Sequence, residues 1–275
     1  MLYICATPIG NLKDITLRAL DVLSSADVVL CEDTRTSKQL FNAHGIRYKK
    51  LVPIHEHNEN SVATSVIEWL KEGLTVVQIS DAGTPGVSDP GARLCSRVYD
   101  AGFSISPLPG ACAYISLLSV SGLNCKTLFY GFLPNTKVQR IKTLSQWVKT
   151  NFAICIYEAP HRIVDCMTDI VECLGDSREI IMGRELTKQF ETIKKLPAGE
   201  LLEFIVNDNN QQRGEFVLII SPIIEQQAND LSIEQINALN ILKEHLPPKK
   251  AVQIANKIVG GDKDLMYSYL ITQKV

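Results

Sequence analysis

Residues 74–91 read LTVVQISDAGTPGVSDPG and join a short apolar run to a loop rich in glycine and proline. The run at 74–79 has the length and composition of a buried strand. Five of the twelve residues that follow it are glycine or proline. Such a loop is either an ordinary surface turn or a segment whose backbone is shaped to approach a ligand closely. The structures formed by the neighbouring segments decide between these two interpretations.

Short apolar runs alternate with helical patterns from residue 2 to residue 108. Strands are expected at 2–6, 27–31, 51–54, 75–79 and 104–108. The helices between them are expected to end near residues 23, 43, 72 and 101, and Gly45 fits the stop of the second one. This alternation predicts a largely parallel sheet flanked by helices.

Polar clusters follow the predicted strands at 7–11, 32–35, 55–58, 80–91 and 109–112. In sheets of this kind, ligands bind beyond the C-terminal ends of the strands. The loop at 80–91 is therefore expected to form one wall of a ligand site rather than an isolated turn.

The second half of the chain predicts another α/β unit and a helical tail. Strands are expected at 128–134, 152–157, 178–182 and 215–220, with helices around 138–149, up to 173 and at 201–206. Helical patterns at 232–244, 248–259 and 262–271 predict a small module resembling a helix-turn-helix. The expected domains are 1–118, 119–222 and 223–275.

The charge balance does not indicate a basic nucleic-acid binder, because 28 Lys and Arg face 30 Asp and Glu. If RNA is the partner, its basic contacts must be concentrated locally. One candidate cluster is Lys137, Arg140 and Lys142, and another is Lys249 with Lys250. Both could equally be solvated surface.

The eight cysteines predict small core hydrophobes rather than a metal site or disulfides. None belongs to a Cys-x-x-Cys pair, and most lie inside apolar runs. The first ten residues lack a basic segment typical of a signal peptide, and no apolar run approaches about 18 residues. We therefore expect a cytoplasmic protein in a reducing compartment, without a membrane partner.

The loop at 80–91 does not fit the known phosphate-binding loops. Gly86 and Gly91 have the spacing of a P-loop, but Ala92 and Arg93 follow instead of Lys and Ser or Thr. Pro90 also lacks the N–H group that a phosphate would need. The acidic residues of the loop suit ribose hydroxyls, an amine or a cation better than they suit phosphate.

Nine ordered segments together resemble the tetrapyrrole-methylase superfamily and, within it, the bacterial small-subunit ribosomal RNA cytidine 2′-O-methyltransferases. They run from residue 6 to residue 220: ATPIGNLKDITLRAL, CEDTRTSKQL, HEHNE, SDAGTPGVSDPG, PLPGACA, YGFLP, YEAPHR, GRELTKQFE and RGEFVLII. The resemblance implies two α/β domains with S-adenosylmethionine between them and a homodimer. It also implies methylation of small-subunit (16S) ribosomal RNA near the decoding site, as free RNA or in the assembled small ribosomal subunit.

The resemblance also implies which residues bind the methyl donor. These are Pro8, Asp81, Thr84, Cys112, Ala113, Tyr157, Glu158, Leu186, Glu215 and Phe216. The relatives typically have PGPSA where this chain has PGACA at 109–113, so Cys112 replaces a hydroxyl. Cys112 could contact the donor or simply fill space. No metal is implied.

Methyl transfer from a sulfonium to a ribose oxygen depends on in-line positioning and is helped by a general base. The candidate bases are Glu32, Asp33, His55, Glu56, Glu158, His161 and Glu185. Any of them could instead be a helix cap or an ion-pair partner. We favour Asp33 with Arg35, or Glu185 with Lys188, on the acceptor side; Lys188 could instead lower the hydroxyl pKa or hold a phosphate.

Two other functions remain open from the sequence. One is a methyltransferase acting on a tetrapyrrole precursor, against which the EDTR and HEHN segments and the helical tail argue. The other is a non-catalytic RNA-binding module, which predicts damaged donor loops. Apart from Ala111 and Cys112, these loops match the family pattern.

Overall fold

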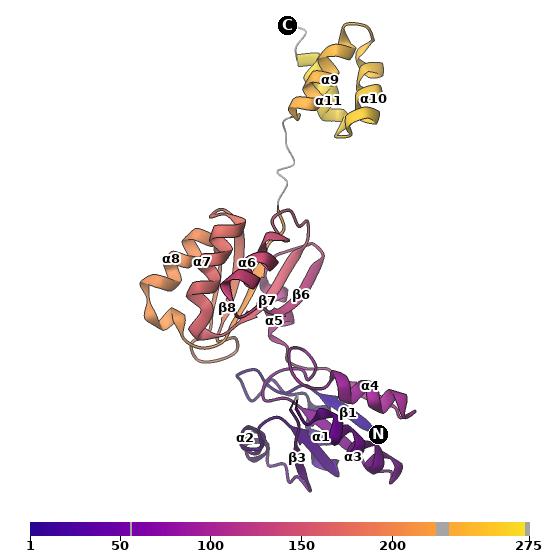
Figure 1. The fold of residues 1–275 in the computed structure, drawn as a ribbon, viewed down its shortest axis with the longest axis vertical. Helices are drawn as coiled ribbons and strands as arrows, with labels where there is room; N and C mark the ends of the chain where they lie inside the picture. Colours follow the sequence, from indigo (N-terminus) through magenta and orange to yellow (C-terminus); the bar gives the residue numbers. More distant parts are fainter. Residues whose placement is uncertain (56, 224–230, 273–275) are drawn as a thin grey trace. The chain divides into compact units, whose positions relative to one another are not determined.

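The computed structural model describes residues 1–55, 57–223 and 231–272 (Figure 1). The chain divides into two compact units, Met1–Ile223 and Ile224–Val275. The first unit contains two five-stranded sheets, and the second is helical. The predicted α/β architecture with a helical C-terminal module is thus confirmed, whereas the predicted boundary at 118/119 stays a prediction.

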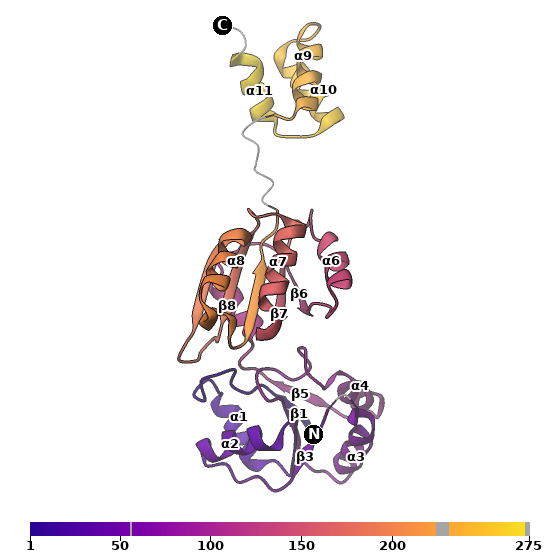
Figure 2. The same cartoon turned by 60° about the vertical axis from the view of Figure 1, so that its left-hand side comes forward.

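The first sheet is parallel throughout, as predicted. Its order is β3-β2-β4-β1-β5, with β1 (Leu2–Cys5), β2 (Val28–Cys31), β3 (Leu51–Pro53), β4 (Val76–Ile79) and β5 (Ile105–Leu108). The four helices are α1 (Leu17–Ser25), α2 (Thr34–His44), α3 (Glu59–Lys71) and α4 (Ala92–Asp100). Figure 2 shows α1 and α2 on one face of the sheet and α3 and α4 on the other. All C-terminal strand ends therefore meet at one edge.

Local signals explain where two of these helices begin and end. The first starts at Leu17 rather than at residue 14, because the Thr16 hydroxyl accepts a hydrogen bond from the Ala19 amide and caps it there. The second ends at Gly45, whose φ of 65° is the left-handed conformation expected of a C-terminal glycine.

The second sheet is mixed and is built on a different plan. Its order is β6-β7-β10-β8-β9, with β6 (Thr127–Phe132), β7 (Ala153–Glu158), β8 (Glu179–Arg184), β9 (Thr192–Pro197) and β10 (Phe216–Ile220). Only β6 and β7 pair in parallel, and β10 runs antiparallel to both of its neighbours. The edge strand β9 was not predicted, because Lys194 and Lys195 interrupt its apolar pattern. Lysine is common on edge strands, where it discourages pairing with another chain.

Helices cover both faces of the second sheet. Three of them, α6 (Lys137–Ser145), α7 (Ile163–Leu174) and α8 (Ala198–Asn207), pack on the face that holds the larger apolar core. The helix α5 (Ala113–Val120) buries Leu117 against the opposite face. The helix expected at 138–149 ends at Ser145, and the one expected at 201–206 is longer at both ends.

The C-terminal unit consists of α9 (Ile233–Lys243), α10 (Pro248–Val259) and α11 (Lys263–Thr272), close to the predicted ranges. Ser232 and Gln235 form a reciprocal capping box at the start of α9. Leu239, Ala255 and Met266 lie in the small core that the three helices share. No helix among the described residues is long and apolar enough to cross a membrane.

Candidate active site

The glycine-rich loop at 80–91 is fixed to the loop that follows β1. The Thr7 and Gly83 backbones exchange two hydrogen bonds of 2.8 and 3.0 Å, and the Thr7 hydroxyl donates to the Ser80 carbonyl at 3.0 Å. At the far end, the buried Glu59 carboxylate accepts from the amides of Gly91 and Leu94 and so holds the start of α4. The loop is therefore a rigid wall rather than a mobile surface turn.

Gly91 is required by its surroundings. Its φ of 143° is unfavourable for other residues, and an added Cβ would lie 2.9 Å from the Gln78 amide nitrogen. The Gln78 side chain in turn donates to the Pro90 carbonyl at 2.8 Å. The glycine and proline residues of the loop thus allow the tight backbone conformation that this position requires.

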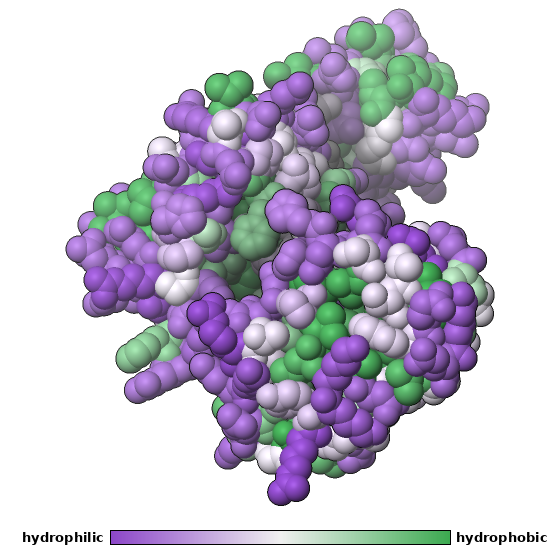
Figure 3. Space-filling model, turned by 60° about the horizontal axis from the view of Figure 1, so that its bottom comes forward, coloured by the Kyte–Doolittle hydropathy of each residue, from purple (hydrophilic) through white to green (hydrophobic). Residues whose placement is uncertain are grey.

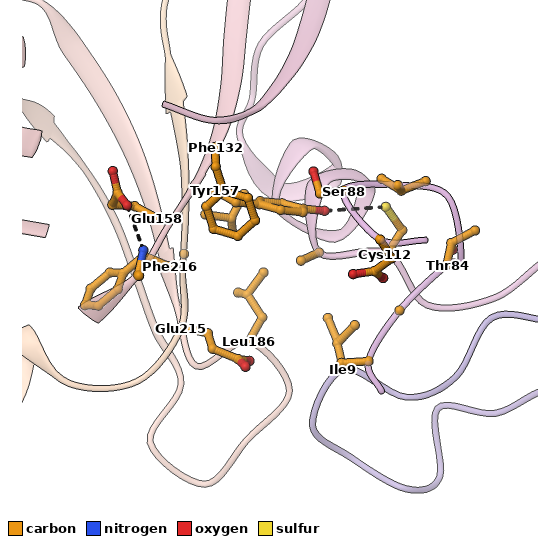
Figure 4. A pocket seen from close by; sticks show the side chains of 18 of the residues that line it. Ile9, Thr84, Ser88, Cys112, Phe132, Tyr157, Glu158, Leu186, Glu215 and Phe216 are labelled. Atoms are coloured by element: carbon orange, nitrogen blue, oxygen red, sulfur yellow. Dashed lines mark hydrogen bonds between the residues drawn. The ribbon is translucent and has the colours of Figure 1, made fainter. Parts of the chain in front are cut away.

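A cavity of about 380 Å³ lies where the loops of the two sheets meet (Figure 4). The first sheet contributes residues 9, 82–84, 87–89 and 112–113, and the second contributes 132, 157–160, 183, 186 and 215–217. The surface of the unit is visibly hollowed, and hydrophobic side chains lie in the hollow (Figure 3). This volume and lining are typical of a site for a small organic ligand.

Tyr157 joins the two halves of this cavity. Its hydroxyl accepts a hydrogen bond from the Tyr114 amide at 3.2 Å and lies 3.9 Å from the Cys112 sulfur (Figure 4). Its ring meets Phe129 and Phe132 edge-to-face, with centroid distances of 5.0 and 5.8 Å. Burial raises the pKa of Tyr157, so its hydroxyl stays neutral.

Glu158 follows Tyr157 on β7, and its carboxylate points away from the cavity (Figure 4). The side chain is buried, accepts from its neighbouring Ala159 amide at 2.9 Å and pairs with Arg162 at 3.2 Å. Consecutive residues of a strand face opposite sides of the sheet, which explains this direction. Glu158 can therefore meet a ligand in the cavity through its backbone.

A second cavity of about 210 Å³ adjoins the first and shares Ile9, Ala82 and Glu215 with it. The predicted donor-binding residues divide between the two cavities. The larger one is lined by Thr84, Cys112, Ala113, Tyr157, Glu158, Leu186, Glu215 and Phe216. Pro8 and Asp81 line the second cavity, together with Lys188. The structure thus brings these residues to two neighbouring spaces.

Asp33 and Arg35 line neither of these two cavities. One Asp33 oxygen caps α2 by accepting from the Arg35 amide at 2.7 Å, and the other meets the Arg35 guanidinium at 2.7 Å. These bonds lower the pKa of Asp33 to about 2, which makes its carboxylate a weak proton acceptor. The Asp33 amide donates to the Asp81 carboxylate at 2.9 Å. This geometry suits a residue that positions Asp81.

Lys188 lies between two carboxylates. Its Nζ is 2.8 Å from Glu185 and 2.8 Å from Glu215. Burial alone raises the pKa of Glu185, but the hydrogen bonds from Lys188 and the Glu215 amide outweigh it and leave that pKa lowered. Burial likewise lowers the pKa of Lys188, but its two carboxylate partners leave it raised. Lys188 therefore stays protonated beside the second cavity, with its positive charge balanced by Glu185 and Glu215.

Asp89 belongs with Asp81 to the acidic residues of the loop that the sequence marks as suited to ribose hydroxyls, an amine or a cation, but the sequence did not single it out as a candidate base. Asp89 lines the larger cavity, and burial together with the neighbouring charges of Glu32 and Asp81 raises its pKa to about 6, against a hydrogen bond from Ser80. Its position in the same loop as Asp81 was the available signal. Burial also raises the pKa of Asp81. A carboxylate with a pKa near neutrality is suited to exchange protons with a ligand.

Glu32, a further candidate base, lines neither of the two cavities. Neither His55 nor His161 lines them, and Glu56 falls outside the described residues. Among the residues that the structure describes, no group of three or more His, Cys, Asp or Glu side chains is arranged to hold a metal ion.

Residues 1–202 match the family model described as tetrapyrrole (corrin/porphyrin) methylases. The chain is 43% identical over 274 residues to the ribosomal RNA small subunit methyltransferase I of Neisseria meningitidis serogroup B, covering 99% of this chain and 94% of that protein. It is 41% identical over 274 residues to the protein of the same name from Escherichia coli O157:H7, covering 99% and 95%.

Two solved structures show a similar fold at low sequence identity. A cobalt precorrin-4 methyltransferase of cobalamin biosynthesis matches with a TM-score of 0.57 and 17% identity, over 79% of this chain and 93% of that one. The uroporphyrin-III C-methyltransferase of Thermus thermophilus, complexed with S-adenosyl homocysteine, matches with a TM-score of 0.54 and 16% identity, over 79% and 96%. These similarities concern the fold of the two sheets.

Proposed function

The chain belongs to the tetrapyrrole (corrin/porphyrin) methylase family, and on this premise we propose that it methylates the ribose 2′-hydroxyl of a cytidine in small-subunit ribosomal RNA. S-adenosylmethionine is the proposed donor. The relatives that match over almost the whole chain, helical unit included, are named small-subunit ribosomal RNA methyltransferases. That full-length similarity favours RNA over a tetrapyrrole precursor as the acceptor.

The cavity between the loops of the two sheets is the observation that carries the proposal. Its aromatic side, with Tyr157 and Phe132, offers apolar contact for the donor. The Thr84 hydroxyl donates to the Ala111 carbonyl at 3.0 Å, which holds the loop before α5 beside the glycine-rich loop. A cationic sulfonium is compatible with this lining, because the described residues that line the cavity include Asp89 and Glu215 and no Lys or Arg.

The adjoining cavity is the proposed acceptor side. There the 2′-oxygen attacks the methyl carbon, the carbon–sulfur bond breaks with its electron pair going to sulfur, and S-adenosylhomocysteine leaves. Alignment of the two reactants supplies about 7–11 kcal/mol of such a barrier in favourable cases. Lys188 would place its positive charge near the acceptor ribose, with Glu185 holding it.

The proton of the 2′-hydroxyl must pass to a base or to solvent. Asp33 and Glu185 have lowered pKa values, and Asp89 has a pKa of about 6. A base works best when its pKa is near the working pH, so Asp89, which lines the donor cavity, fits this role better for a 2′-hydroxyl held at the boundary that the two cavities share. Asp33 would then act on the acceptor side by holding Asp81 through its backbone amide, with Arg35 fixing the Asp33 side chain.

A homodimer in the cytoplasm, acting on ribosomal RNA or the assembled small subunit, completes the proposal. The edge strand β6 leaves Leu128, Tyr130 and Phe132 exposed, which supports a contact with another chain. The domain division at 118/119 is retained as a proposal as well. Within unit 1, α5 (Ala113–Val120) spans this proposed division and packs on β10 and β8 of the second sheet.

The proposal is tested by offering labelled S-adenosylmethionine to the purified protein with three acceptors. These are unmodified small subunits, free 16S ribosomal RNA and a tetrapyrrole precursor. We expect the label to appear in the ribosomal RNA, either within the small subunit or as free RNA. Label in the precursor alone, or no thermal stabilisation by S-adenosylmethionine, would contradict the proposal.

A further inference from the structure

A third surface cavity, of about 690 Å³, lies between the loop that joins β8 to β9 and the segment before β10. We call it the aromatic groove and define it by residues 184–185, 189–192, 208, 210–211 and 213–214. We propose that the aromatic groove binds an unpaired nucleotide of the RNA next to the methylated one, with its base stacked on Phe190. This inference rests on the proposed function and adds how the RNA is held.

Phe190 is the feature that suggests stacking. Its side chain is 67% exposed, although a large aromatic ring gains from burial. The loop carrying it is tied down: the Thr187 amide donates to the Glu191 carboxylate at 2.6 Å, and the Glu191 amide donates to the Lys188 carbonyl at 3.2 Å. Exposed aromatic rings on fixed loops are the platforms on which proteins stack unpaired RNA bases.

Arg184 holds the two walls of the aromatic groove together. It is buried, with 7% exposure, and its guanidinium donates to the Arg213 carbonyl at 2.8 Å and to the Phe190 carbonyl at 3.0 Å. Gly214 allows the walls to approach, because an added Cβ would lie 2.5 Å from the Glu185 side chain. The groove is thus formed before a ligand binds, so binding does not carry the free-energy cost of ordering it.

The charges in the groove leave Arg213 available. Lys188 pairs with the Glu185 carboxylate. Glu191 and Asp208 accept from the Thr187 and Asn210 amides at 2.6 and 2.9 Å and keep their negative charges, which the two arginines that line the groove balance. Within the described part of the chain, no hydrogen bond or ion pair of the Arg213 side chain is found. One free guanidinium beside a stacking ring matches one nucleotide, with its phosphate on Arg213.

The aromatic groove neighbours the proposed reaction site, with the ion-paired side chains of Glu185, Lys188 and Glu215 between them. Glu185 and Gly214 line the groove, Lys188 joins Glu185 to Glu215, and Glu215 lines both of the other cavities. In Figure 4, Glu215 lies beside Leu186 at the edge of the donor cavity. A nucleotide stacked on Phe190 would therefore be a neighbour, on the same RNA strand, of the nucleotide that is methylated.

The test compares Phe190→Ala, Phe190→Leu and Phe190→Trp with Tyr99→Ala in the full chain. Tyr99 is a matched control, because it is 62% exposed and lines none of the three cavities described. The alanine and leucine variants are expected to raise the KM for unmodified small subunits about tenfold, the effect of one lost stacking contact. Their kcat and donor affinity should stay near wild type. The tryptophan variant should retain wild-type KM.

Binding of a fluorescent single-stranded RNA with the sequence of the methylated region gives a readout independent of methyl transfer. Weaker binding by F190L but not by F190W supports the inference, even if the wild-type protein methylates no RNA and the proposed function fails. Arg213→Gln should lower the slope of log affinity against log salt by about one. Equal affinities of wild type, F190A and F190L for this RNA would overturn the inference, as would a loss by Y99A of the same size.

Discussion

Replacing Lys188 by methionine is expected to destabilise the Met1–Ile223 unit by about 1–2 kcal/mol at pH 7. Two opposite charges about 4 Å apart attract by roughly 4 kcal/mol at an effective dielectric constant of 20, and by roughly 1 kcal/mol in water. Lys188 is 29% exposed and Glu185 is 18% exposed. The net interaction energy of this pair, after the cost of desolvation is subtracted, is therefore expected to lie between these two limits. Glu215, at 72% exposure, adds little.

The pH dependence of this loss follows from the two pKa shifts. The lowered pKa of Glu185 contributes stability above its unfolded value of about 4.3, and this is lost as the pH falls through the folded pKa. The raised pKa of Lys188 contributes stability below its unfolded value of about 10.4, and this is lost as the pH rises through the folded pKa. The K188M loss should therefore be largest between about pH 5 and 10.

Urea unfolding followed by tryptophan fluorescence measures this effect in the correct unit, because both tryptophans, Trp69 and Trp147, lie in it. Lys71→Met is the matched control, since Lys71 pairs with Glu68 on an exposed helix surface and should cost about 0.3–0.5 kcal/mol. A K188M loss of equal size at pH 3.5 and pH 7, or one no larger than that of K71M, would refute the reasoning.

Three further substitutions test other parts of the site. The single-turnover rate of the wild-type protein is expected to rise through about pH 6 as Asp89 ionises. Asp89→Asn should abolish this rise while the donor affinity measured by calorimetry is kept, and an unchanged pH profile would exclude Asp89 as the base. Tyr157→Phe should weaken S-adenosylmethionine binding about threefold to tenfold, because the Tyr114 amide loses its acceptor in the cavity wall, and unaltered calorimetric affinity would contradict this. Asp33→Ala should lower the free energy of unfolding at pH 7 through the lost helix cap. That loss should shrink toward pH 2, and a constant loss in urea unfolding across this range would show another cause.

The first sheet could be predicted from the sequence because its strands and helices alternate and are separated by clear turn and helix-end signals. Gly45 ends α2 and the loop at 80–91 follows β4, as the pattern predicts. The antiparallel part of the second sheet was harder to predict from the sequence. Its edge strand β9 carries Lys194 and Lys195, because one face of an edge strand stays in water. Its pairing partner β8 sets its place, and no local pattern does so.

The site was predicted at the level of loops, and side-chain directions required the structure. Alternation along β7 turns the Glu158 carboxylate away from the cavity that Tyr157 lines. The contact of Lys188 with Glu215 joins residues 27 positions apart, and the raised pKa of Asp89 depends on Glu32 and Asp81 from two strand ends. Such features arise from tertiary packing, so local sequence patterns do not carry them.

The most direct test of the central claim is to locate the methyl group on the product. Small subunits from cells that lack this protein are incubated with the purified chain and S-adenosylmethionine, and the ribosomal RNA is digested and examined by mass spectrometry. A single new 2′-O-methylcytidine is expected. A methyl group on a base, on another nucleoside, or on no RNA at all would contradict the central claim.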